Sequence, residues 1–285
     1  MKDSKKSVSR EVGVEIGSIC GRYFLNLEHL HYGYWEGGLE RGIGNLGAAQ
    51  RAYVEFLISH IPAGVKTILD VGCGMGSVAK ELLGLGYEVD CISPSSFLAG
   101  QARALLGDKS EVFECTYEEF ESQKRYDLIL FAESFQYVDM EEGLEKSLRL
   151  LADGGHLLIC DIFKKDVVGQ MGLGGGHNLS KFEDVMGRHP FRLVEDVDIT
   201  EQTAPNIDIL DDALRSAGRP VAEAVLRFLA DRHPVVFKIL RWRYRRRLLR
   251  LAEKYFDGDI SAESFRKFKT YRLFLYSRGG GGPAG

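Results

Sequence analysis

The ten residues from Ile68 to Ser77 constrain this chain more than any other stretch. They read Ile-Leu-Asp-Val-Gly-Cys-Gly-Met-Gly-Ser, an apolar run that ends in three glycines at positions 72, 74 and 76. Residues 78–83 continue with a helix-like pattern, so the stretch predicts a buried strand, a tight glycine turn and a helix N-terminus. This is the order of elements in the nucleotide-binding half of a doubly wound sheet.

The composition of the turn favours a ligand that carries an amine over a dinucleotide. The spacing is G-x-G-x-G rather than the G-x-G-x-x-G of dinucleotide sites, and Asp70 stands just before the first glycine. Glycines let a ligand lie against bare backbone, and a carboxylate at the mouth of the turn attracts a positive charge. An ordinary strand-to-helix turn without a ligand stays open as the alternative.

The stretch 69–76 resembles the first motif of the class I S-adenosylmethionine-dependent methyltransferases. In that family the acid and the glycines of this motif face the amino-acid end of the cofactor. The resemblance therefore implies that the chain binds S-adenosyl-L-methionine, with S-adenosyl-L-homocysteine as product. The positions that inherit this contact are Asp70, Gly72, Cys73, Gly74 and Gly76.

Two later segments extend the resemblance. Ser93 stands where the family usually has an acid that binds the ribose, and a hydroxyl accepts fewer hydrogen bonds than a carboxylate. The sequence Ser93-Pro94 nevertheless resembles a serine-proline turn of the cyclopropane-synthase-like branch, so both residues are expected at the ribose. Thr116, Tyr117 and Glu118 fall where the family holds the adenine, although Thr116 replaces a frequent aspartate.

An aromatic segment precedes the first strand. Residues 29–38 read His-Leu-His-Tyr-Gly-Tyr-Trp-Glu-Gly-Gly, which predicts a packed loop rather than a helix. A lid that only packs on the core is one interpretation. The segment also resembles one that closes over the cofactor, together with an upstream tyrosine, in the branch of cyclopropane synthases and tocopherol-type methyltransferases. By this resemblance Tyr23, Tyr32, Tyr34 and Trp35 face the cofactor.

Candidates for the acceptor side follow the apolar strand 126–131. Ligands of open parallel sheets bind at the carboxyl ends of strands, which points to Glu133, Gln136 and Tyr137; Glu133 and Gln136 are also expected near the cofactor. Residues 172–176 contain four glycines and predict a mobile loop that presents His177, whose ordinary pKa suits proton transfer. The catalytic candidates are His177, Glu133 and Tyr137, and a plain surface histidine remains the alternative for His177.

The strand pattern predicts an α/β fold with a Rossmann-like, seven-stranded methyltransferase sheet whose last strand is antiparallel. The strands are expected at 65–71, 88–93, 111–116, 126–131, 156–163, 191–199 and 269–277. Residues 200–268, between the last two strands, have a mostly helical pattern. A connection of this length is unusual and predicts a cap over the site. The chain divides into a lid (1–60), a cofactor-binding core (61–199), a helical cap (200–268), a final core strand (269–278) and a flexible tail (279–285).

The composition excludes several classes of protein. A net charge of −4 argues against a general nucleic-acid binder, and no His, Cys, Asp or Glu cluster has the spacing of a metal site. No run approaches the ~20 apolar residues of a membrane span, so a cytoplasmic protein is expected.

Four arginines, Arg243, Arg246, Arg247 and Arg250, form one stripe of a predicted surface helix. That stripe is either a solvated face or a contact with an anionic membrane or an anionic substrate.

The function that these observations predict is methyl transfer from S-adenosyl-L-methionine to the O, N or C atom of a small organic acceptor, lipophilic acceptors included. The transfer requires alignment of both partners and, where needed, removal of a proton. Two alternatives remain: a cyclopropane-synthase-like or C-methylating enzyme that acts on a lipid, and a non-catalytic subunit that only binds the cofactor. The oligomeric state is not predicted.

Overall fold

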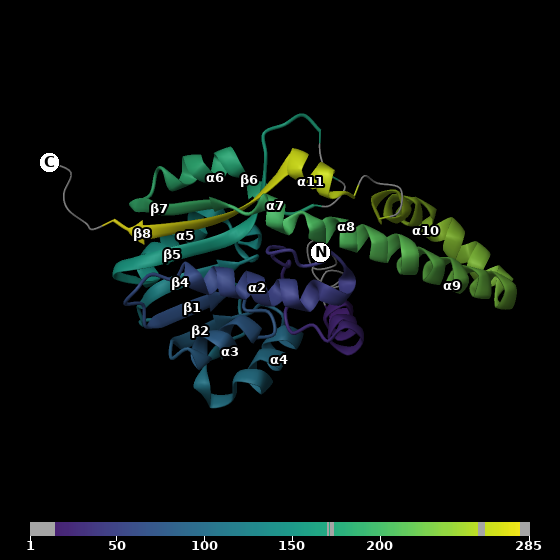
Figure 1. Cartoon of the computed structure of the whole chain (residues 1–285). Coiled ribbons are helices and arrows are strands. Elements are labelled where there is room, and N and C mark those ends of the chain that lie inside the picture. Colours follow the sequence, from purple (N-terminus) through teal and green to yellow (C-terminus); the bar gives the residue numbers. More distant parts are fainter. Residues whose placement is uncertain (1–14, 170, 172–173, 256–259, 280–285) are drawn as a thin grey trace.

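The fold is seen in a computed structural model that describes residues 15–169, 171, 174–255 and 260–279 (Figure 1). Parts of four sequence predictions lie outside these residues: 1–14 of the lid, 172–173 of the glycine-rich loop, 256–259 of the cap and 280–285 of the tail. A single mixed sheet has the strand order β3-β2-β1-β4-β5-β8-β7, with β6 paired to β5. The strands are β1 (Thr67–Val71), β2 (Glu88–Ile92), β3 (Val112–Phe113), β4 (Tyr126–Ala132), β5 (Leu151–Lys164), β6 (His177–Asn178), β7 (Phe191–Asp198) and β8 (Lys269–Arg278).

The predicted topology is confirmed, with one additional strand. Strands β1 to β6 pair in parallel, and β8 runs antiparallel between β5 and β7. The sheet has eight strands instead of seven because β5 continues far enough to pair Phe163 and Lys164 with the two residues of β6. A two-residue strand carries too little alternation to be recognised in a sequence.

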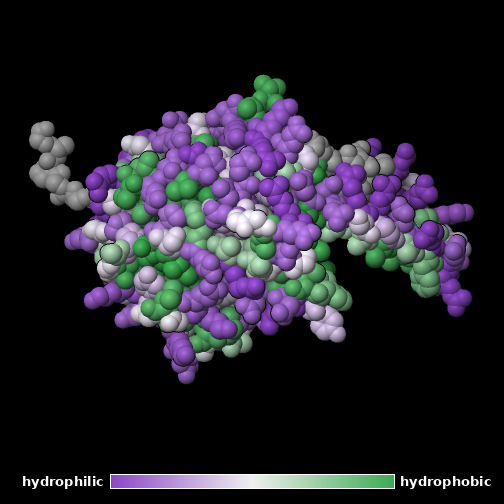
Figure 2. All heavy atoms as spheres, viewed as in Figure 1, coloured by the Kyte–Doolittle hydropathy of each residue, from purple (hydrophilic) through white to green (hydrophobic). Residues whose placement is uncertain are grey.

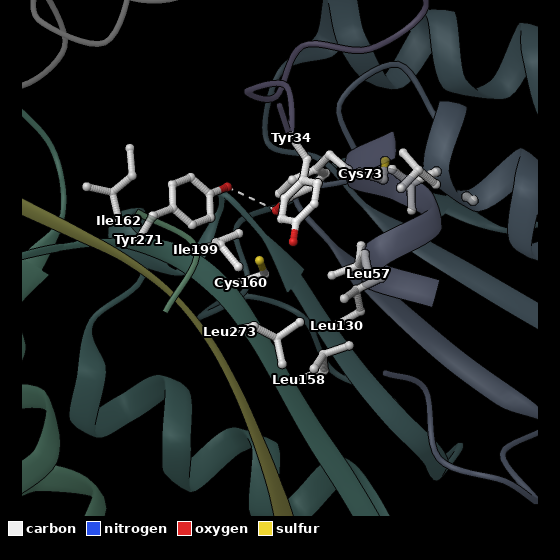
Figure 3. Close-up of a cluster of buried hydrophobic side chains, with 14 of the residues drawn as sticks. Tyr34, Leu57, Cys73, Leu130, Leu158, Cys160, Ile162, Ile199, Tyr271 and Leu273 are labelled. Atoms are coloured by element: carbon white, nitrogen blue, oxygen red, sulfur yellow. Dashed lines mark hydrogen bonds between the residues drawn. The ribbon is translucent and has the colours of Figure 1, made fainter. Parts of the chain in front are cut away.

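Helices cover both faces of the sheet. On one face lie α2 (Leu46–Ser59), α3 (Ser77–Gly84) and α4 (Ser96–Leu106), and on the other lie α5 (Met140–Leu150) and α6 (Leu179–Met186). Each face has its own apolar core. Leu57, Leu130, Leu158 and Leu273 belong to the first core, drawn in Figure 3, and Phe182 belongs to the second. Residues 128–131 of β4 are continuously apolar because this strand contributes side chains to both cores.

The helical insertion lies between β7 and β8, as predicted, but it has two different parts. Its helices are α7 (Thr200–Thr203), α8 (Pro205–Ala213), α9 (Arg219–Arg232), α10 (Pro234–Tyr255) and α11 (Ala262–Phe268). Ile207 of α8 and Phe265 of α11 are buried in the first core. Helices α9 and α10, here called the arm, instead project away from the body, and none of the residues of α9 is buried (Figure 1). The prediction of a cap is therefore wrong for the arm.

Gly218-Arg219-Pro220 contains two residues that commonly end a helix, yet the structure has no break at this point. A five-residue π-helical turn, Leu214–Gly218, joins α8 to α9 without leaving helical backbone. Proline lacks an N–H group, and it is tolerated here because Pro220 lies in the first turn of α9. Among the helices of the described residues, none is long and apolar enough to cross a membrane.

Candidate functional site

The three glycines of the turn after β1 all have positive φ, but their surroundings differ. A Cβ at Gly72 would lie 2.4 Å from Cβ of Ser134, at the end of β4, so this glycine is needed for packing. A Cβ at Gly74, where φ is +58°, would have only Leu30 Cδ1 near it, at 3.8 Å. The backbone at Gly74 therefore leaves space beside it that a ligand can occupy.

Asp70 is a buried carboxylate that lacks a full set of partners. Its side chain lies on β1 just before the turn, and its Oδ2 atom is buried without a hydrogen bond. Burial raises the pKa of Asp70 to about 7. An unpartnered buried carboxylate oxygen costs free energy that a positively charged donor would recover. This feature suits the ammonium group of an amino-acid ligand.

Residues 28–35, the lid segment, cross over this turn. The hydroxyl of Ser77, the first residue of α3, donates a hydrogen bond to the carbonyl of Glu28. Further along, the side-chain amide of Gln50 donates to the carbonyls of His29 and His31, at 3.2 and 2.7 Å. The predicted packed loop is thus present, and hydrogen bonds fix it to both α2 and α3.

The far end of the lid segment reaches the end of β4, where Glu133 lies. Glu133 has φ of +58°, a conformation that is uncommon for a residue with a side chain and often marks a functional site. Its Oε1 atom accepts hydrogen bonds from the backbone N–H of Tyr32 and the hydroxyl of Tyr271, both at 2.7 Å. Burial raises the pKa of Glu133 to about 7, and these two bonds oppose the rise.

Two buried tyrosines form a chain of hydrogen bonds that ends at Glu133. The hydroxyls of Tyr271 on β8 and Tyr53 on α2 lie 3.0 Å apart, the contact that the dashed line in Figure 3 marks beside Tyr271. A phenol has one proton, so when Tyr271 donates to Glu133 its oxygen is left to accept from Tyr53. The chain of hydroxyl groups orients the carboxylate.

A second buried carboxylate, Asp161, lies on β5 beside this group. It accepts hydrogen bonds from the backbone and side-chain N–H groups of Gln136, both at 2.9 Å, and from the N–H of Ile162 at 2.7 Å. Burial raises the pKa of Asp161 to about 7. Gln136 is thereby held by Asp161, and its own Oε1 accepts from Gly176 N at 3.1 Å.

His177 is not carried on a free loop, which corrects the sequence prediction. It lies in β6, and its Nε2 is 3.0 Å from the carbonyl oxygens of both Phe135 and Val138. The preceding glycines are also held, because Lys269 Nζ donates to the carbonyls of Gly174 and Gly175 at 2.9 and 2.7 Å. Glycines alone suggested flexibility, but a buried lysine from a distant strand fixes this end of the loop.

The remaining predicted residues fall into two groups. Tyr23, on the helical residues 15–25, lines a cleft of about 380 Å³ together with Met75 of the glycine turn and Phe97 of α4. Ser93 is buried at the end of β2, next to the exposed Pro94. These positions border the turn and remain candidates for the cofactor.

Other predicted side chains have partners elsewhere. Tyr117 is buried with its hydroxyl 2.9 Å from Ser147, Thr116 bonds to Glu119, and Glu118 accepts a bond from the N–H of Asp139. The side chains of Tyr34 and Cys73 belong to the first core (Figure 3). Gly76 packs against α4, Tyr137 is exposed, and the backbone N–H of Trp35 bonds to Gln202 of α7 at 2.9 Å. The contacts of these residues with the cofactor stay predictions.

Sequence reasoning did not select Tyr271, Tyr53 or Lys269. Each lies in an element whose apolar pattern identified only a strand or a helix, and none belongs to a motif. A hydroxyl or ammonium group at an otherwise apolar, inward-facing position was the available signal, because a buried polar group requires a partner.

The protein family described as "Methyltransferase domain" matches residues 69–157, which include the glycine turn, Glu133 and the first half of β5. These residues are similar to a methyltransferase domain. The domain is similar to that of the ubiquinone biosynthesis O-methyltransferase of Bradyrhizobium diazoefficiens, with 31% identity over 97 residues, 32% of this chain and 38% of that protein. It is also similar to malonyl-[acyl-carrier protein] O-methyltransferase 2 of Ilyobacter polytropus, with 27% identity over 106 residues, 36% of this chain and 41% of that protein. The chain thus matches about two fifths of the length of these curated relatives.

Solved structures of low sequence identity share the fold of most of this chain. Geranyl diphosphate C-methyltransferase from Streptomyces coelicolor A3(2), solved with S-adenosyl-L-homocysteine, has a TM-score of 0.63 and 19% identity, covering 89% of this chain and 90% of that chain. The [4+2]-cyclase SpnF has a TM-score of 0.65 and 15% identity, covering 88% of each chain. At these identities the comparison shows the fold alone, and one fold supports different reactions.

Proposed function

We propose that this chain is an enzyme that transfers a methyl group from S-adenosyl-L-methionine to a small organic acceptor. The observation that carries the proposal is the buried, unpartnered Oδ2 atom of Asp70 beside the open backbone of Gly74, within a methyltransferase domain. A ligand ammonium group bound there would supply the missing hydrogen bond and lower the pKa of Asp70. These residues fit the amino-acid end of the cofactor.

The other proposed contacts with the cofactor come from residues that border the glycine turn. Ser93 offers one hydroxyl to the ribose, and Tyr23 is placed to cover the cleft beside Met75. When bound, S-adenosyl-L-methionine supplies an electrophilic methyl group on its sulfonium. The lid segment excludes water from the region between the turn and Glu133, because its backbone is bonded to both sides.

Glu133 is the proposed proton acceptor. Its Oε1 is held by Tyr32 and Tyr271, which leaves Oε2 to take a proton from the acceptor's nucleophilic atom. A carboxyl whose pKa is about 7 is well matched to proton transfer near neutral pH. Tyr137 is the competing candidate. His177 is less suited, because its Nε2 already contacts two backbone carbonyls.

A lipophilic acceptor is the favoured substrate class. Tyr32, in the lid segment beside Glu133, has its ring 6.1 Å from that of Tyr271 and 6.4 Å from that of Phe265, so aromatic side chains gather on the lid side of this carboxylate. Proteins similar to this chain are named for ubiquinone biosynthesis and for methylation of geranyl diphosphate. An aromatic wall with one polar group is typical of sites for such ligands.

The proposal is tested in two steps. Calorimetry with S-adenosyl-L-methionine should show binding to the wild-type protein and weaker binding to Asp70→Asn. The protein is then incubated with cofactor that carries a deuterated methyl group and with a metabolite extract, and products are sought by mass spectrometry. A product with the labelled methyl group supports methyl transfer, and fragmentation of that product distinguishes a methylated small molecule from a modified lipid chain.

The controls separate the alternatives. Glu133→Gln should bind the cofactor yet lose about 10²- to 10⁴-fold in turnover, whereas the matched variant Glu145→Gln, at an exposed carboxylate, should keep full turnover. Tight cofactor binding with no labelled product from any extract would instead indicate a non-catalytic binding subunit. Absence of cofactor binding would overturn the proposal.

A further inference from the structure

The arm exposes apolar side chains in a regular arrangement. Each of its helices has three large apolar residues at positions i, i+4 and i+7, which lie on one face of a helix. They are Val221, Val225 and Phe228 on α9 and Val235, Ile239 and Trp242 on α10, all more than half exposed. Figure 2 shows hydrophobic atoms gathered on the lower side of the arm. Contiguous exposed apolar surface of this kind usually marks an interaction site.

The arm is also the basic part of an acidic chain. Residues 219–255 contain eleven of the 37 lysines and arginines of the chain but only three of its 41 acidic residues. The side chains of Arg241, Arg243 and Arg245 are exposed, whereas those of Arg247 and Arg250 lie outside the described residues. Of the three acids, Glu223 is already paired with Arg219 at 3.0 Å. The positive charge of the arm therefore favours binding to an anionic partner.

We propose that the arm docks on the surface of a phospholipid bilayer that contains anionic lipid. Apolar stripes with a tryptophan, flanked by arginines, are the features of helices that lie at the boundary between headgroups and acyl chains. The arginines contact lipid phosphates, and the stripes enter the boundary region. Since the rest of the chain carries the excess of acids, an anionic surface repels the body and orients the arm toward the bilayer.

The first test is flotation of the full-length protein with vesicles at low salt. Vesicles of phosphatidylcholine with about 30% phosphatidylglycerol should carry the protein to the top of the gradient, and vesicles of phosphatidylcholine alone should not. High salt should weaken the binding, because it screens the contacts of the arginines. A protein that stays at the bottom with both kinds of vesicle would refute membrane docking.

Charge reversal locates the contact. Arg243→Glu/Arg245→Glu should lower partitioning onto the anionic vesicles about tenfold or more, because each basic residue near such a surface contributes on the order of a tenfold change. The matched control, Lys109→Glu/Arg125→Glu, makes the same change of charge at two exposed positions of the body and should partition like the wild type. Equal loss in both variants would show that only net charge matters and would overturn the role of the arm.

Tryptophan fluorescence tests insertion. The chain has two tryptophans, Trp35, which is 6% exposed, and Trp242, which is 80% exposed. Anionic vesicles should shift the emission to shorter wavelength, and Trp242→Phe should abolish the shift while the protein still floats. No shift in the wild type would contradict insertion.

A second copy of the chain is the competing partner for the arm. A concentration-dependent dimer in light scattering, lost in Phe228→Ser/Trp242→Ser but retained in the control Leu85→Ser, would assign the stripes to self-association and overturn membrane docking. Circular dichroism establishes that these variants remain folded. None of the measurements needs cofactor or acceptor, so their outcome is independent of the methyl-transfer proposal.

Discussion

At the scale of single residues, the positions 72, 74 and 76 share a turn, but each requires glycine for a different physical reason. A side chain at Gly72 would collide with Ser134, and one at Gly76 would press on Ala102 at 3.2 Å. These two positions are fixed by the packing of the turn against β4 and α4. Gly74 has no such contact, so its positive φ of +58° and the space that it leaves for a ligand are the remaining reasons for glycine at that position.

The substitution Gly74→Ala tests this interpretation. We expect it to weaken binding of S-adenosyl-L-methionine by at least about tenfold in calorimetry, while the strain of a positive φ costs only ~1 kcal/mol of stability. Gly64→Ala is the matched control, because Gly64 also has positive φ (+90°) with nothing within 4 Å of a Cβ, and it lies before β1. Unchanged binding by Gly74→Ala would place the cofactor elsewhere.

Ser93→Asp restores the acid that the related motif usually has at the end of β2. The carboxylate would offer two acceptors to the vicinal ribose hydroxyls, and a bond to a charged group contributes ~1.5–3 kcal/mol. Affinity for the cofactor should therefore increase or remain unchanged in calorimetry. Because Ser93 is buried, the free protein should lose some thermal stability. A tenfold loss of affinity would show that another residue holds the ribose.

The hydrogen bond from Tyr271 to Glu133 predicts a shift in the pH dependence of turnover. A base with a pKa of about 7 is active only above that pH, so kcat/KM should rise through neutrality. Tyr271→Phe removes a donor that stabilises the carboxylate, and the midpoint should move to higher pH. Glu133→Gln should abolish this limb of the profile. A profile that is the same in all three proteins would exclude Glu133 as the base.

At the scale of elements, the lid segment connects the glycine turn to the root of the helical insertion. Asn206 of α8 is buried and forms two hydrogen bonds with the backbone of Gly33, accepting from its N–H at 2.8 Å and donating to its carbonyl at 2.7 Å. A Cβ at Gly33 would lie 2.5 Å from that of Ala49 on α2, so the segment must have glycine there. The insertion therefore holds the lid in place even though the arm does not cover the site.

Asn206→Ala should destabilise this connection. The substitution leaves a buried N–H and a buried carbonyl without partners, which costs ~1–3 kcal/mol for each group that water cannot reach. Urea denaturation should show this loss in the free energy of unfolding. Asn45→Ala is the control, since the bond from Asn45 to the carbonyl of Glu40 is exposed, and it should change stability by less than about 0.5 kcal/mol. Equal effects would contradict a special role for Asn206.

At the scale of the whole molecule, buried titratable groups make stability depend on pH. Asp70 has a pKa of about 7 in the folded chain and an ordinary value of 3.8 when exposed. Between these values the unfolded chain loses the proton and the folded chain keeps it, so stability falls as pH rises through this window. His31, whose pKa burial lowers to about 3, acts oppositely, because the unfolded chain takes up a proton as pH falls below about 6.5.

Comparing the stability of the wild type with that of Asp70→Asn isolates the effect of the Asp70 carboxyl group, since both proteins contain His31. The variant should gain stability relative to the wild type as pH rises from about 4 to about 7, by up to ~4 kcal/mol, and the difference should then level off. Thermal unfolding of the cofactor-free proteins at several pH values measures this. A difference that does not change with pH would mean that Asp70 is ionised in the folded chain.

The sequence by itself determined the central elements of this protein. The apolar run and glycines of 68–76 identified β1, its turn and α3, and the continuous apolar residues 128–131 identified a strand that is buried on both faces. These signals are local, because strand and helix periods and the freedom of glycine are read from neighbouring residues. The antiparallel direction of the last strand followed from the resemblance of these motifs to the methyltransferase family, and the pairing of β8 with β5 confirms it.

Only the tertiary structure decided what surrounds the reacting region. Tyr271 meets Glu133 across 138 positions of sequence, Lys269 holds a loop 95 residues away, and Asp70 is left with an oxygen that no side chain satisfies. The arm likewise continues α8 outward instead of closing over the site. Hydrogen bonds and burial depend on which distant residues become neighbours, and no local period encodes that information.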